Sequence, residues 1–192
     1  NTKEFMPLDD GLIWLYEKVE DDDGLLYKVF SQGERSVAGE NVTVFAWKYA
    51  TRQALDEDEE GANELFFMET YWSKAEGAVF FHGSDSAVGT SGVDPWATLI
   101  YEFPLTFGTV NAWEEDITES GSDGESWTAE FVAIEDVDTD GGEFPGSMHI
   151  RFAEVDGLSP FSGDYWIARN TGIVQFTLDS DPDVIWALKT FE

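Results

Sequence analysis

The chain has 192 residues, with 40 Asp and Glu against 10 Lys and Arg, which gives a formal net charge of −30. Because 42% of the residues are hydrophobic and 15% aromatic, we expect a folded core rather than an acidic disordered chain. The charge excludes nucleic acid as a partner and disfavours an anionic membrane surface, since both require clustered cationic side chains.

The sequence contains no cysteine, which excludes disulfides and any metal or nucleophile site built on a thiol. No apolar run is long enough for a transmembrane segment. No signal-peptide pattern is present, and a mature chain whose leader had been removed would look the same.

Short apolar runs, rich in β-branched and aromatic residues, follow one another between Gly, Pro, Asp and Ser. The first half predicts strands over 12–19, 25–30, 42–49, 65–72 and 78–82. The second half predicts them over 97–103, 110–118, 127–134, 148–155, 165–168, 173–178 and 184–191. No segment has a convincing helical period. The expected fold is therefore all-β and antiparallel, either a β-sandwich or an open half-barrel.

Alternation within the runs predicts which side chains share a face of the sheet. Three such sets are expected: Met148 with Ile150 and Phe152, Thr43 with Phe45, Trp47 and Tyr49, and Trp127 with Phe131 and Ala133. His149 and Arg151 should then lie on the face opposite to Met148.

Two phrases recur along the chain. Pro7-Leu8-x2-Gly11-x2-Trp14 returns as Pro104-Leu105-x2-Gly108-x4-Trp113, and Tyr71-Trp72-x4-Gly77-x-Val79 returns as Tyr165-Trp166-x5-Gly172-x-Val174. Order and internal spacing are both kept, which is typical of an internal duplication. We expect residues 1–97 and 98–192 to be two β-repeats that share one structural unit.

The repeated phrases resemble those of bacterial exported lipoproteins of unassigned function, which often open on Phe-Pro-Leu-x2-Gly-x2-Trp and close on Tyr-Trp-x(4-5)-Gly-x-Val. Phe103 to Gly108 and Tyr165 to Val174 carry the likeness. A further hairpin motif of such proteins is matched loosely by Glu135 to Phe144, with Asp-Gly in place of Pro-Ala. The resemblance implies a secreted or membrane-tethered β-protein that resembles the half-barrels of lipoprotein carriers, and no catalytic residues. The cysteine that carries the lipid in such proteins is absent.

One acidic motif suggests a metal site. Asp136, Asp138 and Asp140 alternate and are followed by two glycines, as in the first half of a calcium loop. Ser147 occupies the position where such a loop has its bidentate Glu, so Glu143 and backbone carbonyls would have to complete a looser site. The competing interpretation is an acidic hairpin turn without metal. Calcium is the cofactor that these four carboxylates predict.

No enzyme class is indicated, and we expect no catalytic residues. The sequence lacks a nucleophile elbow, a phosphate loop and a dinucleotide fingerprint. Of the two histidines, His149 falls on an expected strand, where a packed or hydrogen-bonded histidine is the default. Glycosidases use two carboxylates across a cleft, but among 40 carboxylates some pair must lie at a suitable distance. The presence of such a pair therefore does not indicate a glycosidase.

The preferred hypothesis is a non-catalytic exported β-protein of the cell surface or extracellular matrix. It would act by self-association through β-edges, a surface fibre subunit being one variant, or by ligand binding. The alternative is a calcium-assisted glycan-binding module, which an exposed coplanar row of Trp would favour. The high negative charge also predicts a halophilic protein that salt stabilises.

Overall fold

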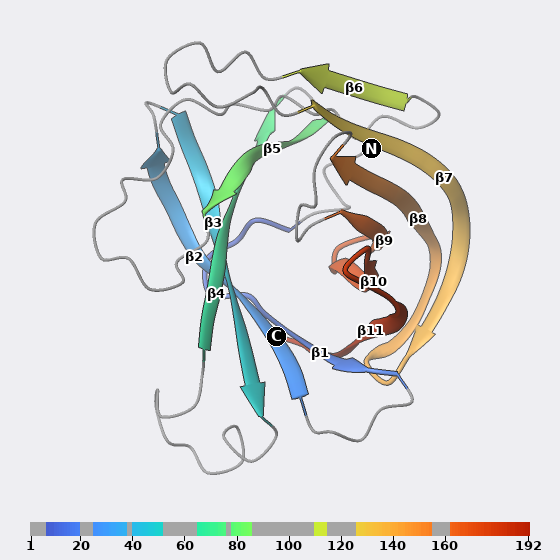
Figure 1. Ribbon diagram of the computed structural model, residues 1–192. Coiled ribbons are helices and arrows are strands. Elements are labelled where there is room, and N and C mark those ends of the chain that lie inside the picture. Colours follow the sequence, from blue (N-terminus) through green and yellow to red (C-terminus); the bar gives the residue numbers. More distant parts are fainter. Residues whose placement is uncertain are drawn as a thin grey trace.

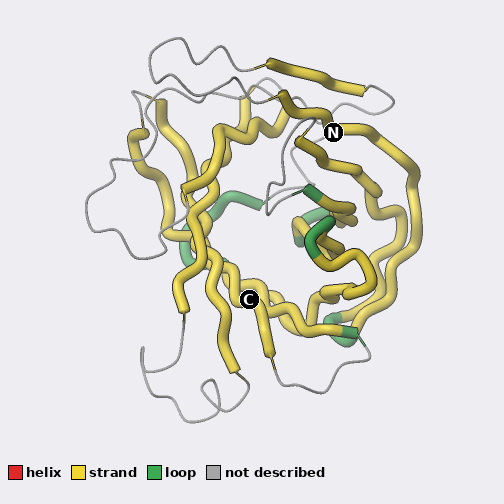
Figure 2. The backbone as a smooth tube through the Cα atoms, viewed as in Figure 1, coloured by secondary structure: helices red, strands yellow, loops and turns green. Residues whose placement is uncertain are grey.

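The structure is a computed structural model that describes residues 7–19, 25–37, 40–51, 65–75, 78–85, 110–114, 126–154 and 162–192. Every regular element among these residues is a β-strand (Figures 1 and 2). The strands are β1 (Ile13–Lys18), β2 (Leu25–Val37), β3 (Glu40–Thr51), β4 (Leu65–Ala75), β5 (Ala78–Asp85), β6 (Val110–Glu114), β7 (Ser126–Thr139), β8 (Gly142–Glu154), β9 (Gly163–Ala168), β10 (Gly172–Leu178) and β11 (Asp181–Phe191).

All eleven strands belong to one sheet in the order β5-β4-β3-β2-β1-β11-β10-β9-β8-β7-β6. Each neighbouring pair is antiparallel. The sheet curls around its own interior without closing, as Figure 1 shows. The chain is therefore an all-β, antiparallel open half-barrel, which confirms that part of the predicted fold class. Among the described residues no helix is long and apolar enough to cross a membrane.

Each predicted run that falls on described residues lies in a strand. The observed strands β2, β7 and β8 are longer than predicted because polar and acidic residues extend them beyond the apolar runs. The predicted strand over 97–103 and the phrase that opens at Pro104 lie outside the described residues.

The core lies inside the curl and is dominated by aromatic rings. Tyr16 is at its centre, 1% exposed, stacked on Trp47 and edge-on to Phe176. Its hydroxyl donates to the backbone oxygen of Ile173 at 2.8 Å, so a side chain of β1 reaches β10 across the intervening β11. The buried members of this cluster are Trp14, Tyr16, Tyr27, Val29, Phe45, Trp47, Val137, Met148, Ile150, Phe152, Ile167, Ala168, Ile173, Val174, Phe176, Trp186 and Leu188.

Alternation predicted two of the faces correctly. Met148, Ile150 and Phe152 all enter the core, and so do Phe45 and Trp47. Thr43 is buried as well, and the side chain of Tyr49 lies outside those that the structure describes. The prediction that Phe131 and Ala133 share a face is wrong. A bulge lies between them, so Phe131 is opposite Ile150 while Ala133 is opposite His149, on the other face of β8. An extra residue in a strand reverses the alternation, and composition alone does not reveal it.

The described strands can be arranged as two five-strand meanders, β1 to β5 and β6 to β10, with β11 between them. The Tyr-Trp pairs fall on the fourth strand of each meander, β4 and β9. Their faces differ, however. Trp72 packs against the main core and Tyr71 joins Val42 and Val44 in a second cluster, whereas Tyr165 stacks on Phe176 of the main core. The duplication of 1–97 and 98–192 therefore stays a prediction.

Candidate functional site

Exposed apolar side chains gather at two places. Among the described residues, the exposed large hydrophobic side chains are Val132 and Ile134, exposed by 47% and 50%, and Val19 and Ile185, exposed by 45% and 37%. The first two lie on β7. The second two lie on neighbouring strands near the end of β1, where the Val19 nitrogen donates to the Ile185 oxygen at 2.8 Å. Both places involve the β7–β8 hairpin.

The first place is the outer side of β7. The pairing with β6 runs from Ser126 to Glu130 and stops there. Beyond Glu130, no described strand pairs with β7 on the side away from β8, and Figure 1 shows β7 as the outermost arc of the curl. We call residues 132–139 the open edge. Among the described residues nothing pairs with its backbone groups on that side, and an unpaired strand edge of this kind can accept a further strand.

Two features limit pairing at the open edge. The ladder between β7 and β8 is interrupted between Phe131 and Ala133 and again between Glu135 and Val137. Glu135, Asp136 and Asp138 are exposed along the same stretch. Bulges and charged side chains are both devices by which sheets keep their edges from pairing indiscriminately.

The second place is formed where the tip of the β7–β8 hairpin docks on β11. The Gly141 nitrogen donates to the Leu188 oxygen at 2.9 Å, and Val137 is buried in the main core. The contact requires glycine, because a Cβ at position 141 would lie 2.8 Å from that same Leu188 oxygen. The β10–β11 ladder ends at the pair formed by Gln175 and Ala187, one residue before Leu188. The hairpin tip therefore occupies the place where β10 leaves β11.

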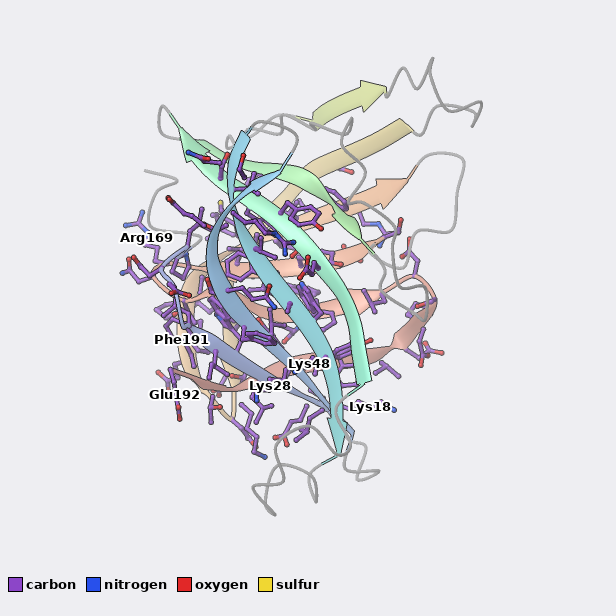
Figure 3. The ribbon with its side chains drawn as sticks, turned by 90° about the vertical axis from the view of Figure 1, so that its left-hand side faces the viewer. Lys18, Lys28, Lys48, Arg169, Phe191 and Glu192 are labelled. Carbon is purple, nitrogen blue, oxygen red and sulfur yellow. The ribbon has the colours of Figure 1, made fainter. Side chains whose placement is uncertain are left out.

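Docking leaves a groove of about 430 Å³ between the hairpin tip and strands β1, β10 and β11. We call this volume the tip groove. Its lining consists of Glu17, Lys18, Val19, Asp138, Thr139, Asp140, Gln175, Ile185, Ala187 and Leu188. Figure 3 places Lys18 at one end of the sheet and Phe191 and Glu192 at the other, so the groove lies at the Lys18 end.

Two carboxylates of the tip groove have no cationic partner among the described residues. Asp138 and Asp140 are exposed and form no ion pair or side-chain hydrogen bond with any described residue. Glu17 is different, because Lys189 donates to it at 2.6 Å. The Lys18 ammonium lies 5.7 Å from the centre of the Trp186 ring. The groove is therefore acidic, with an apolar rim formed by Val19 and Ile185.

The structure does not gather all four residues predicted to bind calcium into one loop. The expected loop is a two-residue turn at Asp140 and Gly141, and Asp136, Asp138 and Glu143 all lie on strands. Asp136 accepts a hydrogen bond from the Gly146 nitrogen at 2.8 Å, while Asp138 is opposite Glu143 in the ladder. Among the described residues no group of three or more acidic or histidine side chains is arranged to hold a metal. Calcium binding stays a prediction.

Sequence reasoning missed the residues that complete the tip groove. Glu17, Lys18 and Ile185 meet the hairpin only because β1 pairs with β11. Glu17 and Lys18 lie more than a hundred positions before the hairpin tip, and no local pattern in the sequence indicates contacts of that range. The one local signal was the Gly141-Gly142 pair, which suggested a tight turn but not what the turn would dock against.

A network of polar side chains covers the face of β8 and β9 opposite to the core. The His149 Nε2 atom is 2.8 Å from Asp164, and its ring stacks on Trp166 at 4.3 Å between centroids. Arg151 donates to Asp164 at 3.1 Å and to Asp179 at 2.7 Å. Burial, followed by the Asp179 charge, raises the pKa of the neighbouring Tyr165. His149 is therefore a hydrogen-bonded histidine on a strand, as expected.

The described Trp side chains do not form an exposed platform. Trp14, Trp47 and Trp186 are buried in the core, and Trp72 and Trp166 are partly buried. A row of exposed coplanar Trp, which would favour glycan binding, is absent from this part of the chain. Trp96, Trp113 and Trp127 lie outside the residues whose side chains are described.

No protein-family model matches the chain, and a search of curated proteins finds no relative. Two solved structures have a similar backbone course. One is a “putative exported protein with YmcC-like fold” from Bacteroides fragilis, 12% identical over 98% of both chains, with a TM-score of 0.49. The other is a “putative lipoprotein” from Parabacteroides distasonis, 11% identical over 98% of this chain and 99% of that one, with a TM-score of 0.46. At TM-scores this low, neither likeness carries an inference about this chain.

Proposed function

We propose that this chain is a non-catalytic protein of the cell surface or extracellular space that assembles with copies of itself through the open edge of β7. The exported location rests on the resemblance of its repeated phrases. The observation that supports assembly is an edge, unpaired among the described residues, that exposes Val132 and Ile134 two positions apart along one strand. β-branched side chains of this kind are those that pack well across paired strands.

The apolar contacts at this edge favour a weak interaction. Fully burying a Val or Ile side chain contributes about 1.5–3 kcal/mol, and these two are about half exposed. In a symmetric pair of copies, four such side chains would contribute roughly 3–6 kcal/mol by the same coefficient. Association costs about 4–15 kcal/mol, so the backbone hydrogen bonds of the new strand pair are needed to make it favourable. Assembly should therefore depend on concentration.

Charge should make the assembly depend on salt as well. Each copy brings Glu135, Asp136 and Asp138 to the same edge and a formal net charge of −30 to the encounter. Raising the ionic strength from about 0.1 M to 1 M shortens the screening length from roughly 10 Å to 3 Å. Repulsion between copies then falls while the apolar contacts are kept, so high salt should promote pairing.

The test is the molar mass of the chain in solution, measured by analytical ultracentrifugation over a range of concentrations at about 0.1 M and 1 M NaCl. Two matched double variants separate the open edge from general hydrophobicity: Val132→Thr with Ile134→Thr, and Val19→Thr with Ile185→Thr. Both replace one Val and one Ile of similar exposure by a β-branched polar residue. In 1 M NaCl we expect the molar mass to rise with concentration for the wild type and for Val19→Thr with Ile185→Thr, but not for Val132→Thr with Ile134→Thr. A wild type that stays monomeric at both salts, or equal loss in both variants, would refute the proposal.

A further inference from the structure

The tip groove shares Asp138 and Thr139 with the open edge, but the rest of its lining lies on the hairpin turn and on or next to strands β1, β10 and β11. We infer that it binds a linear aliphatic polyamine. The inference depends on the shape, charge and apolar rim of this groove, and it is independent of the proposed assembly.

The size of the groove suits a small molecule. Its volume of about 430 Å³ falls within the usual range for small-ligand sites, about 300–1,000 Å³. The docked hairpin also keeps the groove in shape, because the tip is held by the bond from Gly141 to Leu188 and by the burial of Val137. A site built on paired strands is held more precisely than one on a loop.

The charge of the groove selects a cation. Asp138 and Asp140 face it without an ion-pair partner among the described residues, and Glu17 adds a third carboxylate whose charge is shared with Lys189. Asp138 and Asp140 are two residues apart at the end of a strand, a separation of roughly 7 Å between their backbones. Separate negative charges at such a distance match ammonium groups that a methylene chain holds apart.

The apolar rim and Lys18 narrow the choice of ligand further. Val19 and Ile185 expose apolar surface at the groove, which a compact hydrated metal ion cannot cover but a methylene chain can. Lys18 lies in the same lining and would repel a bound ammonium. Removing its charge should therefore strengthen polyamine binding, whereas it would weaken the binding of an anion. This opposite sign makes Lys18 a useful probe of the ligand's charge.

The experiment is calorimetric titration of the whole chain with spermidine at about 0.15 M NaCl, where diffuse binding to surface carboxylates is screened. Two double variants change the net charge equally: Asp138→Asn with Asp140→Asn, and Asp9→Asn with Asp10→Asn. Asp9 and Asp10 are exposed like Asp138 and Asp140, but they precede β1 at the end away from the groove. We expect the groove variant to bind spermidine about three- to tenfold more weakly and the control to bind within about 1.5-fold of the wild type.

Two further variants complete the test. Lys18→Met should tighten spermidine binding about two- to threefold, and Val19→Thr with Ile185→Thr should weaken it by a similar factor. Equal weakening in the groove and control charge variants would overturn the inference, because it would identify diffuse attraction to the acidic surface. The inference would also be overturned if an equal concentration of Ca²⁺ displaced spermidine from the wild type but not from Asp138→Asn with Asp140→Asn. That result would identify a metal site. The edge variant Val132→Thr with Ile134→Thr should bind spermidine normally, so failure of either proposal leaves the other intact.

Discussion

Replacing Gly141 by alanine should detach the β7–β8 hairpin tip from β11. The added Cβ would lie 2.8 Å from the Leu188 oxygen and 3.2 Å from its carbonyl carbon, and both are backbone atoms that a side-chain rotation cannot move. Gly141 is not among the glycines with positive φ, so its backbone conformation is one that alanine tolerates. Any loss of stability would therefore come from the close approach to β11.

The size of the effect follows from what the tip contributes. Losing the bond from the Gly141 nitrogen to the Leu188 oxygen costs about 0.5–1.5 kcal/mol. If the tip moves out, Val137 leaves the core, which adds about 1.5–3 kcal/mol. Alanine lowers the entropy of the unfolded chain and returns about 0.4–1 kcal/mol. The expected net loss in the free energy of unfolding is about 1–4 kcal/mol, by the same three terms.

Urea unfolding followed by Trp fluorescence measures this loss, and hydrogen exchange at the Gly141 amide reports docking directly. Asp140→Ala is the control, because Asp140 is exposed in the same turn and its replacement should change stability by about 0.5 kcal/mol at most. Gly141→Ala should accelerate exchange at the tip and weaken spermidine binding in the tip groove. A variant as stable as the wild type, with unchanged protection of the tip amides, would refute the docking argument.

Three further predictions concern salt, pH and calcium. The melting temperature should rise between about 0.1 M and 1 M NaCl, because screening relieves repulsion among carboxylates in the folded chain, and an unchanged value would contradict this. Burial raises the Tyr16 pKa well above its ordinary value, so its contribution to stability is complete below about pH 10 and is lost as the pH rises above that unfolded-state pKa. In Tyr16→Phe the free energy of unfolding should therefore fall less steeply above pH 10, by up to about 1.4 kcal/mol per pH unit. An identical slope in the two proteins would show that Tyr16 does not cause the alkaline loss of stability. Calcium titrated in high NaCl should bind the wild type more strongly than Asp138→Ala, whereas equal heats would indicate that the acidic hairpin holds no metal.

The strands could be predicted from the sequence because each is a short alternating run between turn residues. Polar extensions were harder to predict. Asp136 and Asp138 suggested a loop, but Val137 between them is buried in the core and holds that stretch in β7. Local charge favoured a turn, and burial of one Val side chain outweighed it. The bulge between Phe131 and Ala133 was invisible for a similar reason, since it changes the direction of side chains without changing composition.

The candidate sites could be predicted only in part. Asp138 and Asp140 stood out because they alternate before two glycines. Their actual neighbours, Glu17 and Ile185, depend on the pairing of β1 with β11 and have no signature near either strand. The open edge of β7 also depends on where β6 stops pairing, which is a property of the assembled sheet.

The position of β11 bears on how the chain folds as it is synthesised. β11 is the last strand in chain order, yet it lies in the middle of the sheet and pairs with both β1 and β10. Until residues 181–191 have emerged, β1 lacks its neighbour and the two meanders have no strand to join them. The bond between Lys189 and Glu17 spans 172 positions, and contacts of such range make folding slow. A chain that must wait for its final strand presents an unpaired, aromatic sheet to its surroundings, so its emergence from the ribosome is the moment when it most needs protection from aggregation.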